Sequence, residues 1–265
     1  MKKFLLVALG ACTMTPIGQD VKPLPLMSEI SDLAVGSTCA NFSWSSRGKA
    51  PLAYMKGMSL VFAKAVCEIN SPANQIISKA STGESMDSLS FYSSEFNRLG
   101  MPNIGGVDTL RHAYVMMIGL GMRESSGRYC CGRDLSADNV KSDTVEAGLF
   151  QTSWNASYFS SVAKTLSRTD TGCFLSTFYE GVRCPESDLK NWGDGRGLQF
   201  QVDSKECPAY GATFAAIIVR KGGGLKGHYG PIRRKEVQIR PECNDLLLKV
   251  QKMVESNPAF CEVLK

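Results

Sequence analysis

The sequence predicts a mainly α-helical domain with a few short strands and several disulfides. Over most of the chain apolar residues recur at intervals of three and four, the spacing of a helix that buries one face. Of the 265 residues, 43% are hydrophobic and 21% are charged, a composition that can build a substantial core. The third observation is the count of ten cysteines, which in an exported chain indicates disulfides.

The first twelve residues have the features of an export signal. Lys2 and Lys3 give it a positive start, and the apolar segment Phe4–Gly10 follows. The run Leu-Gly-Ala-Cys that ends at Cys12 resembles a bacterial lipobox, in which the cysteine is lipidated and becomes the mature N-terminus. Ordinary signal cleavage a few residues further on is the alternative. We therefore expect an exported protein, placed in the periplasm or outer membrane as a lipoprotein, or secreted.

Beyond the signal at residues 1–12, the chain divides into a linker and one folded domain. We expect the linker at residues 13–30, because Gln19–Met27 contains two prolines and has the composition of a tether. Residues 31–265 then form the domain, with helical extensions at both ends. No stretch approaches the roughly 20 apolar residues of a membrane-spanning helix, so we expect membrane contact only through the lipid.

The cysteines predict disulfides rather than a metal site. The chain has no C-x2-C pair and only His112 and His228 to assist, so we expect no metal and no other cofactor, although the acidic loop after Cys131 leaves calcium open. If Cys12 carries lipid, nine cysteines remain and one stays free or pairs between molecules. Cys130 and its neighbour Cys131 are each expected to join a different element.

Secondary structure follows from the apolar periodicity and the breaks between segments. Helices are predicted over Leu52–Ile69, Asn74–Lys79, Ser88–Leu99, a segment capped by Asp108 or Thr109 that runs to about Arg123, Ser153–Leu166, Gly172–Val182, Pro208–Lys221 and Glu242–Ser256. Extended segments are predicted over Gly148–Thr152, Leu198–Val202 and Glu236–Ile239.

Glu124 ends the helix with the clearest apolar stripe. It lies seven residues after Met117 and three after Gly121, and so shares their face. Apolar neighbours and the carbonyl end of the helix dipole both disfavour a carboxylate there. We therefore expect a raised pKa, which suits a general acid for glycoside cleavage. A solvated glutamate at a fraying helix end is the alternative that periodicity alone leaves open.

Two short motifs give this glutamate a context. The helix ends in Glu124-Ser-Ser-Gly, and the segment Glu-Ala-Gly-Leu-Phe-Gln-Thr-Ser begins at Glu146. The pair, over Met117–Trp154, resembles the goose-type lysozymes and the soluble lytic transglycosylases. In those families a Glu-Ser dipeptide at a helix end carries the catalytic acid, and a Gly-Leu-Met-Gln segment forms the floor of the sugar cleft. Here Phe150 stands in place of the methionine.

The resemblance implies an α+β lysozyme-like catalytic domain with Glu124 as the acid. Gly148 allows close approach of a ligand, and Gln151 offers both a donor and an acceptor to a sugar. Tyr229 is assigned to the site only from its position late in the chain, since no motif surrounds it. The expected substrate-binding residues are Ser125, Tyr129, Gly148, Gln151, Ser153 and Tyr229.

A partner carboxylate for Glu124 is less defined. Among Asp134, Asp138, Asp143 and Glu146, Asp143 best matches the aspartate that goose-type enzymes carry shortly before their glycine. The second aspartate of that family is Ser153 here. An inverting hydrolase needs a second carboxylate roughly 6.5–9.5 Å away, whereas lytic transglycosylases use one glutamate. The sequence leaves both mechanisms open, with Asp143 as the optional base.

We expect a peptidoglycan-degrading glycosidase that cleaves the bond between N-acetylmuramic acid and N-acetylglucosamine. Its partners would be glycan strands and, in some settings, a protein inhibitor. The net charge of +5 favours an anionic polymer but is too weak to indicate nucleic acid. A chitin-acting glycosidase and a non-catalytic lipoprotein that binds peptidoglycan or a partner are the alternatives.

Overall fold

The computed structural model describes residues 25–136 and 139–264, and it confirms the mainly helical prediction with few strands and several disulfides. The first half contains α1 (Pro25–Val35), α2 (Thr38–Asn41), β1 (Ser43–Trp44), β2 (Gly48–Lys49), α3 (Leu52–Cys67), α4 (Pro72–Ile77), α5 (Ser88–Phe91), α6 (Ser93–Arg98) and α7 (Gly106–Ser125). The second half contains η1 (Ser142–Thr144), η2 (Trp154–Phe159), α8 (Ser161–Thr165), η3 (Arg168–Asp170), α9 (Leu175–Tyr179), α10 (Glu186–Leu189), α11 (Gly195–Glu206), α12 (Pro208–Gly222), α13 (Gly230–Arg233), α14 (Pro241–Glu255) and α15 (Pro258–Val263).

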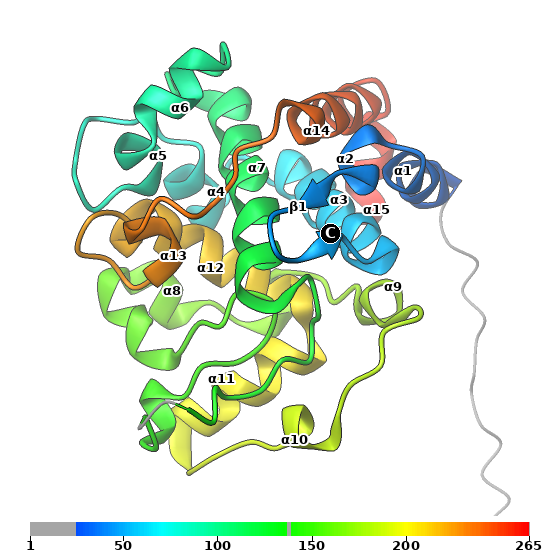
Figure 1. Ribbon diagram of the computed structural model, residues 1–265. Coiled ribbons are helices and arrows are strands. Elements are labelled where there is room, and N and C mark those ends of the chain that lie inside the picture. The colour runs from blue at the N-terminus through cyan, green and yellow to red at the C-terminus, as the bar shows by residue number, and fades with distance from the viewer. Residues whose placement is uncertain (1–24, 137–138, 265) are drawn as a thin grey trace, which may run out of the picture.

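Helix α7 passes through the middle of the molecule, with α14 above and α11 below it in the view of Figure 1. It packs against α3, α12 and α14. Its residues from Thr109 to Met122 are all buried, so the helix is enclosed on every side rather than along one stripe. The last turn emerges at the lower end of α7, where Glu124 lies.

Glycines let neighbouring segments approach this helix closely. A methyl group at Gly121 would overlap the hydroxyl of Tyr54, and one at Gly119 would overlap the backbone oxygen of Gln238. The Tyr54 hydroxyl lies 3.0 Å from the carbonyl oxygen of Ile118 and is held against the helix there. The end of α7 is thereby fixed by α3 on one side and by the segment before α14 on the other.

The N-terminal and C-terminal helices close the upper part of the molecule. Helix α1 packs against α3 and α14, and its Ile30 and Ala34 are fully buried. The linker expected at residues 13–30 is therefore wrong for its last six residues, because Pro25 is the first residue of α1. The signal segment 1–12 and the lipidation site Cys12 lie outside the described residues.

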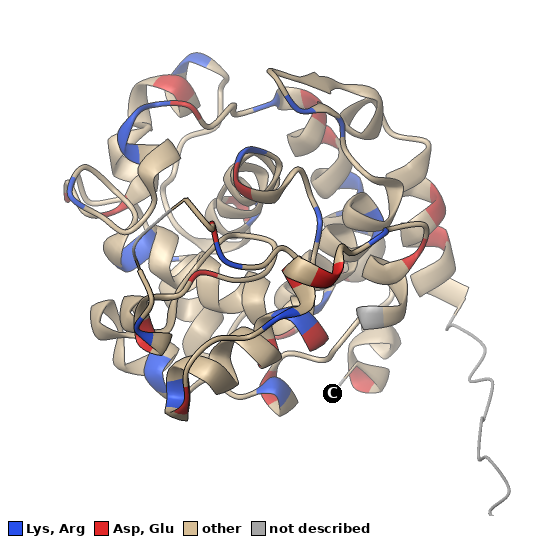
Figure 2. Cartoon of the chain, turned by 60° about the horizontal axis from the view of Figure 1, so that its bottom comes forward, with Lys and Arg blue, Asp and Glu red and all other residues tan. Residues whose placement is uncertain are grey.

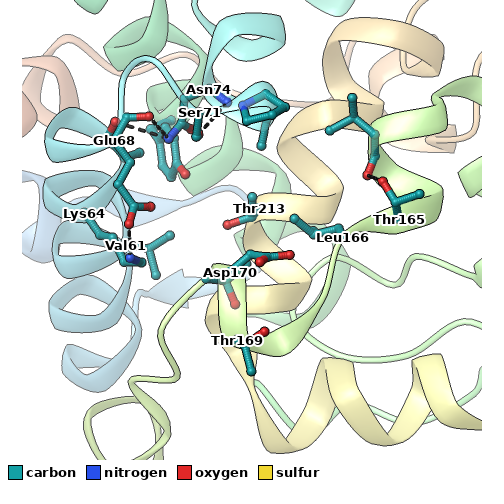
Figure 3. A pocket seen from close by; sticks show the side chains of 16 residues that line it. Val61, Lys64, Glu68, Ser71, Asn74, Thr165, Leu166, Thr169, Asp170 and Thr213 are labelled. Atoms are coloured by element: carbon teal, nitrogen blue, oxygen red, sulfur yellow. Dashed lines mark hydrogen bonds and ion pairs between the residues drawn. The ribbon is translucent and has the colours of Figure 1, made fainter. Parts of the chain in front are cut away.

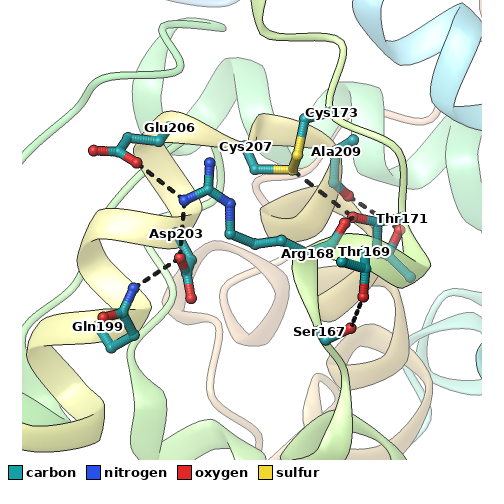
Figure 4. Close-up of a disulfide and its surroundings, with 11 residues drawn as sticks. Ser167, Arg168, Thr169, Thr171, Cys173, Gln199, Asp203, Glu206, Cys207 and Ala209 are labelled. Atoms are coloured by element: carbon teal, nitrogen blue, oxygen red, sulfur yellow. Dashed lines mark hydrogen bonds and ion pairs between the residues drawn. A yellow bond between two sulfur atoms is a disulfide. The ribbon is translucent and has the colours of Figure 1, made fainter.

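Four disulfides join segments that are distant in the sequence. Cys39–Cys243 and Cys67–Cys261 tie the first helices to the last two. In the lower part the bridges are Cys130–Cys184 and Cys173–Cys207. Beside the last bridge, Arg168 reaches both Asp203 and Glu206 (Figure 4).

Cys131 remains a free, buried thiol, so the expectation that it joins another element is wrong. Its Sγ lies 3.8 Å from the carbonyl oxygen of Ser125, at the end of α7. Burial raises the pKa of this thiol, with the nearby guanidinium of Arg128 acting in the opposite direction.

The strand predictions are largely wrong. Leu198–Val202 lies inside α11, where buried residues recur at 197, 200–201 and 204–205. Glu236–Ile239 is extended but pairs with no described strand, because Val237 donates its amide to the Tyr92 hydroxyl instead. Gly148–Thr152 is a turn closed by a single bridge from residue 147 to residue 152. The only ladder among the described residues is the hairpin β1–β2.

The shorter predicted helices are interrupted. Ser88–Leu99 divides into α5 and α6, and Ser153–Leu166 divides into the 3₁₀ segment η2 and α8. Of Gly172–Val182, only Leu175–Tyr179 is helical. In the described part of the chain, no helix combines the length and the apolar character needed to cross a membrane.

Candidate functional site

Glu124 occupies the last turn of α7 and is half-buried. The next residue but one, Ser126, has a left-handed backbone with φ 55°, and Gly127 follows with φ 73°. Their amides donate to the carbonyl oxygens of Met122 and Gly121 at 3.1 and 3.2 Å, which ends the helix cleanly. The turn leads the chain away from Glu124, whose carboxyl remains at the carbonyl end of the helix.

The environment of Glu124 raises its pKa to about 8. Burial is the largest cause, and the negative charge of Glu146 adds to it. The guanidinium groups of Arg234, Arg47 and Arg123 act in the opposite direction. The direction expected from the helix register is therefore found, and at neutral pH the carboxyl group is largely protonated.

Glu146, rather than Asp143, is the carboxylate whose charge acts on Glu124. It is half-buried, and burial raises its own pKa as well. Asp143 is exposed in η1. Asp143 is favoured by the sequence alone because its distance from Gly148 along the chain resembles that of the aspartate in goose-type enzymes. The better signal was that Glu146 directly precedes the Ala-Gly-Leu-Phe-Gln segment, which the fold brings to the end of α7.

Gly148 and Gln151 shape the turn that follows Glu146. Gly148 has φ 76°, and a Cβ there would press on the backbone oxygen of Ser204 at 3.0 Å. Its amide donates to the carbonyl oxygen of Cys131 at 2.8 Å. Gln151, with φ 43°, donates its side-chain amide to the same oxygen at 3.3 Å. Both residues thus fasten the turn to the loop after α7, and the Gln151 amide is used inside the protein.

Tyr229 lies close to both glutamates, as its place late in the chain suggested. Its buried hydroxyl is 2.9 Å from that of Thr152. Its pKa is raised by burial, while the Thr152 hydrogen bond lowers it and the charges of Glu124 and Glu146 raise it further. The turn at Thr152 and the segment before α13 therefore meet beside the end of α7.

The remaining predicted binding residues are Ser125, Ser153 and Tyr129, and all three are buried. Ser125 donates its hydroxyl to the Gly121 carbonyl oxygen at 3.0 Å, and Ser153 donates to Asn155 at 2.7 Å. Tyr129 is buried, with its ring centroid 5.7 Å from that of Tyr179. The hydroxyl groups of Ser125 and Ser153 are therefore used in hydrogen bonds within the protein, and Tyr129 lines a separate pocket of about 210 Å³ with Tyr179.

Three arginines near Glu124 were not identified from the sequence. Arg47 comes from the hairpin, Arg123 from α7 and Arg234 from the segment after α13. Figure 2 shows acidic and basic residues mixed over the described part of the chain. The net charge of the protein therefore gives no sign of the three arginines that gather near Glu124. Arg234 is more than a hundred residues from Arg123 in the sequence, and only the fold brings both to Glu236.

Two pockets help to place the site. One of about 400 Å³ adjoins the end of α7 and is lined by Arg47 and Arg123. Another, of about 440 Å³, lies between α3, α4, α8 and α12, where Lys64 and Asn74 line it (Figure 3). Neither Glu124 nor Glu146 lines either pocket, but the first pocket borders the last turns of α7, the helix that carries Glu124. In the described ranges, no three His, Cys, Asp or Glu side chains gather in a way that could hold a metal ion.

Comparison with protein-family models, with curated proteins and with solved structures finds no match for this chain. The resemblance to goose-type lysozymes and lytic transglycosylases therefore rests on the residues of the two motifs.

Proposed function

We propose that the protein is a peptidoglycan-degrading glycosidase, a muramidase or lytic transglycosylase, with Glu124 as its general acid. The observation that carries the proposal is a glutamate at a helix end whose pKa is raised to about 8 by burial and by a second glutamate. A general acid for glycoside cleavage must hold its proton at the working pH, and a carboxyl group with an ordinary pKa does not. The motif resemblance supplies the substrate class.

Glu124 donates its proton to the glycosidic oxygen as the bond to the anomeric carbon breaks. The sugar then carries oxocarbenium character, and a nearby carboxylate stabilises it or activates the attacking oxygen. We assign this second role to Glu146, because its charge acts on Glu124 while Asp143 is exposed. Tyr229 positions the turn that follows Glu146 through its hydrogen bond to Thr152.

Purified sacculi and mass spectrometry of the released fragments test the proposal. Wild-type protein should release muropeptides, and Glu124→Gln should release them at least about a hundredfold more slowly. Glu84→Gln is the matched control, because Glu84 is an exposed glutamate on another part of the chain. Absence of release by the wild type, with chitin oligomers also untouched, would overturn the enzyme assignment and favour a binding lipoprotein.

The same digestion separates the two mechanisms. Reducing ends indicate hydrolysis, with Glu146 as the base that activates water. Anhydro ends indicate attack by the sugar's own hydroxyl group. Replacement of Glu146 by Gln should slow either reaction more than replacement of Asp143 by Asn, and the reverse order would restore Asp143 as the partner of Glu124.

A further inference from the structure

The pocket beside the end of α7, here called the arginine pocket, is built by three segments. It is lined by Trp44, Ser45, Ser46, Arg47, Gly119, Met122, Arg123, Glu236 and Gln238 and has a volume of about 400 Å³. The hairpin β1–β2 forms one wall, the last turns of α7 form another, and the extended segment before α14 forms the third. The space suits a branch of a polymer rather than a whole large ligand.

The charge around this pocket is positive. Arg123 and Arg234 both pair with Glu236, at 3.0 and 2.8 Å, so these two arginines share one carboxylate. Arg47 donates to the backbone oxygen of Arg123 at 2.6 Å, and no carboxylate of the described residues forms an ion pair with it. Two positive charges are therefore uncompensated next to the pocket.

Trp44 supplies a second observation that points to a ligand. Its ring lines the pocket and is only 3% exposed, yet its indole nitrogen has no hydrogen-bond partner. An indole N–H can only donate, and a buried donor without an acceptor costs about 1–3 kcal/mol. The nitrogen itself is closed to solvent, so an acceptor oxygen brought by a ligand would remove this cost once the indole ring shifts toward it.

The arginine pocket borders the last turns of α7, the helix that carries the proposed catalytic acid Glu124. The charges of Arg47 and Arg123, both of which line the pocket, act directly on Glu124. A group bound there would lie beside the last turn of α7, in which Arg123 directly precedes Glu124. The group must accept hydrogen bonds and carry negative charge, which is the chemistry of a carboxylate.

We propose that the arginine pocket seats a carboxylate on the acidic side arm of the muramoyl residue, and that it selects peptidoglycan over chitin. This inference rests on the proposed function, because it assigns the arm of that same substrate. The carboxylate has two possible sources, the lactyl group itself and the peptide that extends from it. Chitin carries neither, so it would leave the arginines and the Trp44 donor without a partner.

Binding of defined tetrasaccharides to the Glu124→Gln protein, measured by calorimetry, tests the proposal. Three ligands are compared: alternating GlcNAc–MurNAc with its peptides, the same glycan after an amidase has exposed the lactyl carboxylates, and neutral chitotetraose. Adding Arg47→Gln should weaken binding of the acidic glycans about tenfold and leave chitotetraose unchanged. The acidic glycan that loses more affinity identifies the source of the carboxylate.

Three further variants sharpen the result. Arg183→Gln removes one charge from an exposed position outside the pocket and should change nothing. Arg47→Lys keeps the charge and should retain part of the preference for acidic glycans. Trp44→Phe removes the donor and should reduce that preference. An Arg47→Gln effect that is equal on all three ligands, or absent, would overturn the proposal.

The outcomes also separate this proposal from the proposed function. Selective binding of acidic glycans by a protein that cleaves no sacculi would keep the carboxylate pocket and remove the enzyme. Cleavage of sacculi with no Arg47 effect would keep the enzyme and remove the pocket. Failure to bind any of the three tetrasaccharides would overturn the pocket, whatever the digestion shows.

Discussion

At the scale of single residues, the protonation of Glu124 should govern activity. Because its pKa is raised to about 8 by burial and by Glu146, the acid form predominates through neutral pH. We expect kcat/KM on soluble glycan to fall about tenfold per pH unit above this value. Rates measured from pH 5 to 10, with protein folding checked at each point, would show the alkaline limb. An alkaline limb with its midpoint near pH 4.5, the ordinary value for a glutamate, would contradict this account.

The same raised pKa makes a prediction about stability. The folded protein holds a proton on Glu124 between its ordinary value of 4.5 and about 8, whereas the unfolded chain releases it. Stability of the wild type should therefore decline as pH rises through this window, by up to about 1.4 kcal/mol per unit for one proton. Glutamine carries no charge, so Glu124→Gln should be the more stable protein at pH 9 and differ little at pH 4.

Urea unfolding of the two proteins at these pH values makes the comparison, with Glu84→Gln as the control for loss of an exposed charge. If the difference in unfolding free energy between the wild type and Glu124→Gln stays constant from pH 4 to pH 9, Glu124 is solvated. The raised pKa on which the catalytic role of Glu124 depends would then be absent.

At the scale of elements, the approach of α3 to α7 positions the helix end that carries Glu124. A methyl group at Gly121 would overlap the Tyr54 hydroxyl, which is held between α7 carbonyl groups. Gly121→Ala should destabilise the protein by about 1–3 kcal/mol and disturb Glu124 one turn away. Gly36→Ala is the control, since a methyl group there makes ordinary contact. Thermal unfolding that is equal for both variants would contradict this packing.

The long helices were predictable from the sequence and the short elements were not. Segments such as Leu52–Ile69 and Pro208–Lys221 carry several turns of apolar residues, so the local pattern outweighs other influences. Leu198–Val202 is too short to show its period, and the decisive burial of Phe200 and Ser204 comes from packing on α12 and the turn at Gly148. Glu236–Ile239 has an extended backbone, but its partner is a tyrosine hydroxyl, which no local pattern reveals.

The residues of the candidate site also fall into two groups, those that the sequence predicts and those that only the fold brings together. Glu124 was found because its position at the end of a long apolar helix, followed by Ser-Ser-Gly, is a local property of the sequence. The closeness of Glu146, Tyr229 and the arginines depends on four segments that meet only in the folded chain. Spacing along the chain favoured Asp143 for this reason, although it is exposed.

At the scale of the whole molecule, two disulfides tie the chain ends together around α3 and α14. Cys67–Cys261 joins residues 194 positions apart and therefore restricts the unfolded chain strongly. Replacing both cysteines by serine should cost about 2–5 kcal/mol of unfolding free energy. Cys131→Ser is the control, because that thiol is free. Calorimetric unfolding of both variants measures the difference, and equal transitions would show that the bridge contributes little.

The central claim is that the fold holds Glu124 protonated at neutral pH. Its most direct test is a carbon-13 NMR titration of protein labelled at the glutamate carboxyl carbon, with the Glu124 signal identified by its absence in Glu124→Gln. The account predicts that this signal titrates with a midpoint near pH 8. A midpoint near 4.5, the ordinary value for a solvated glutamate, would contradict it.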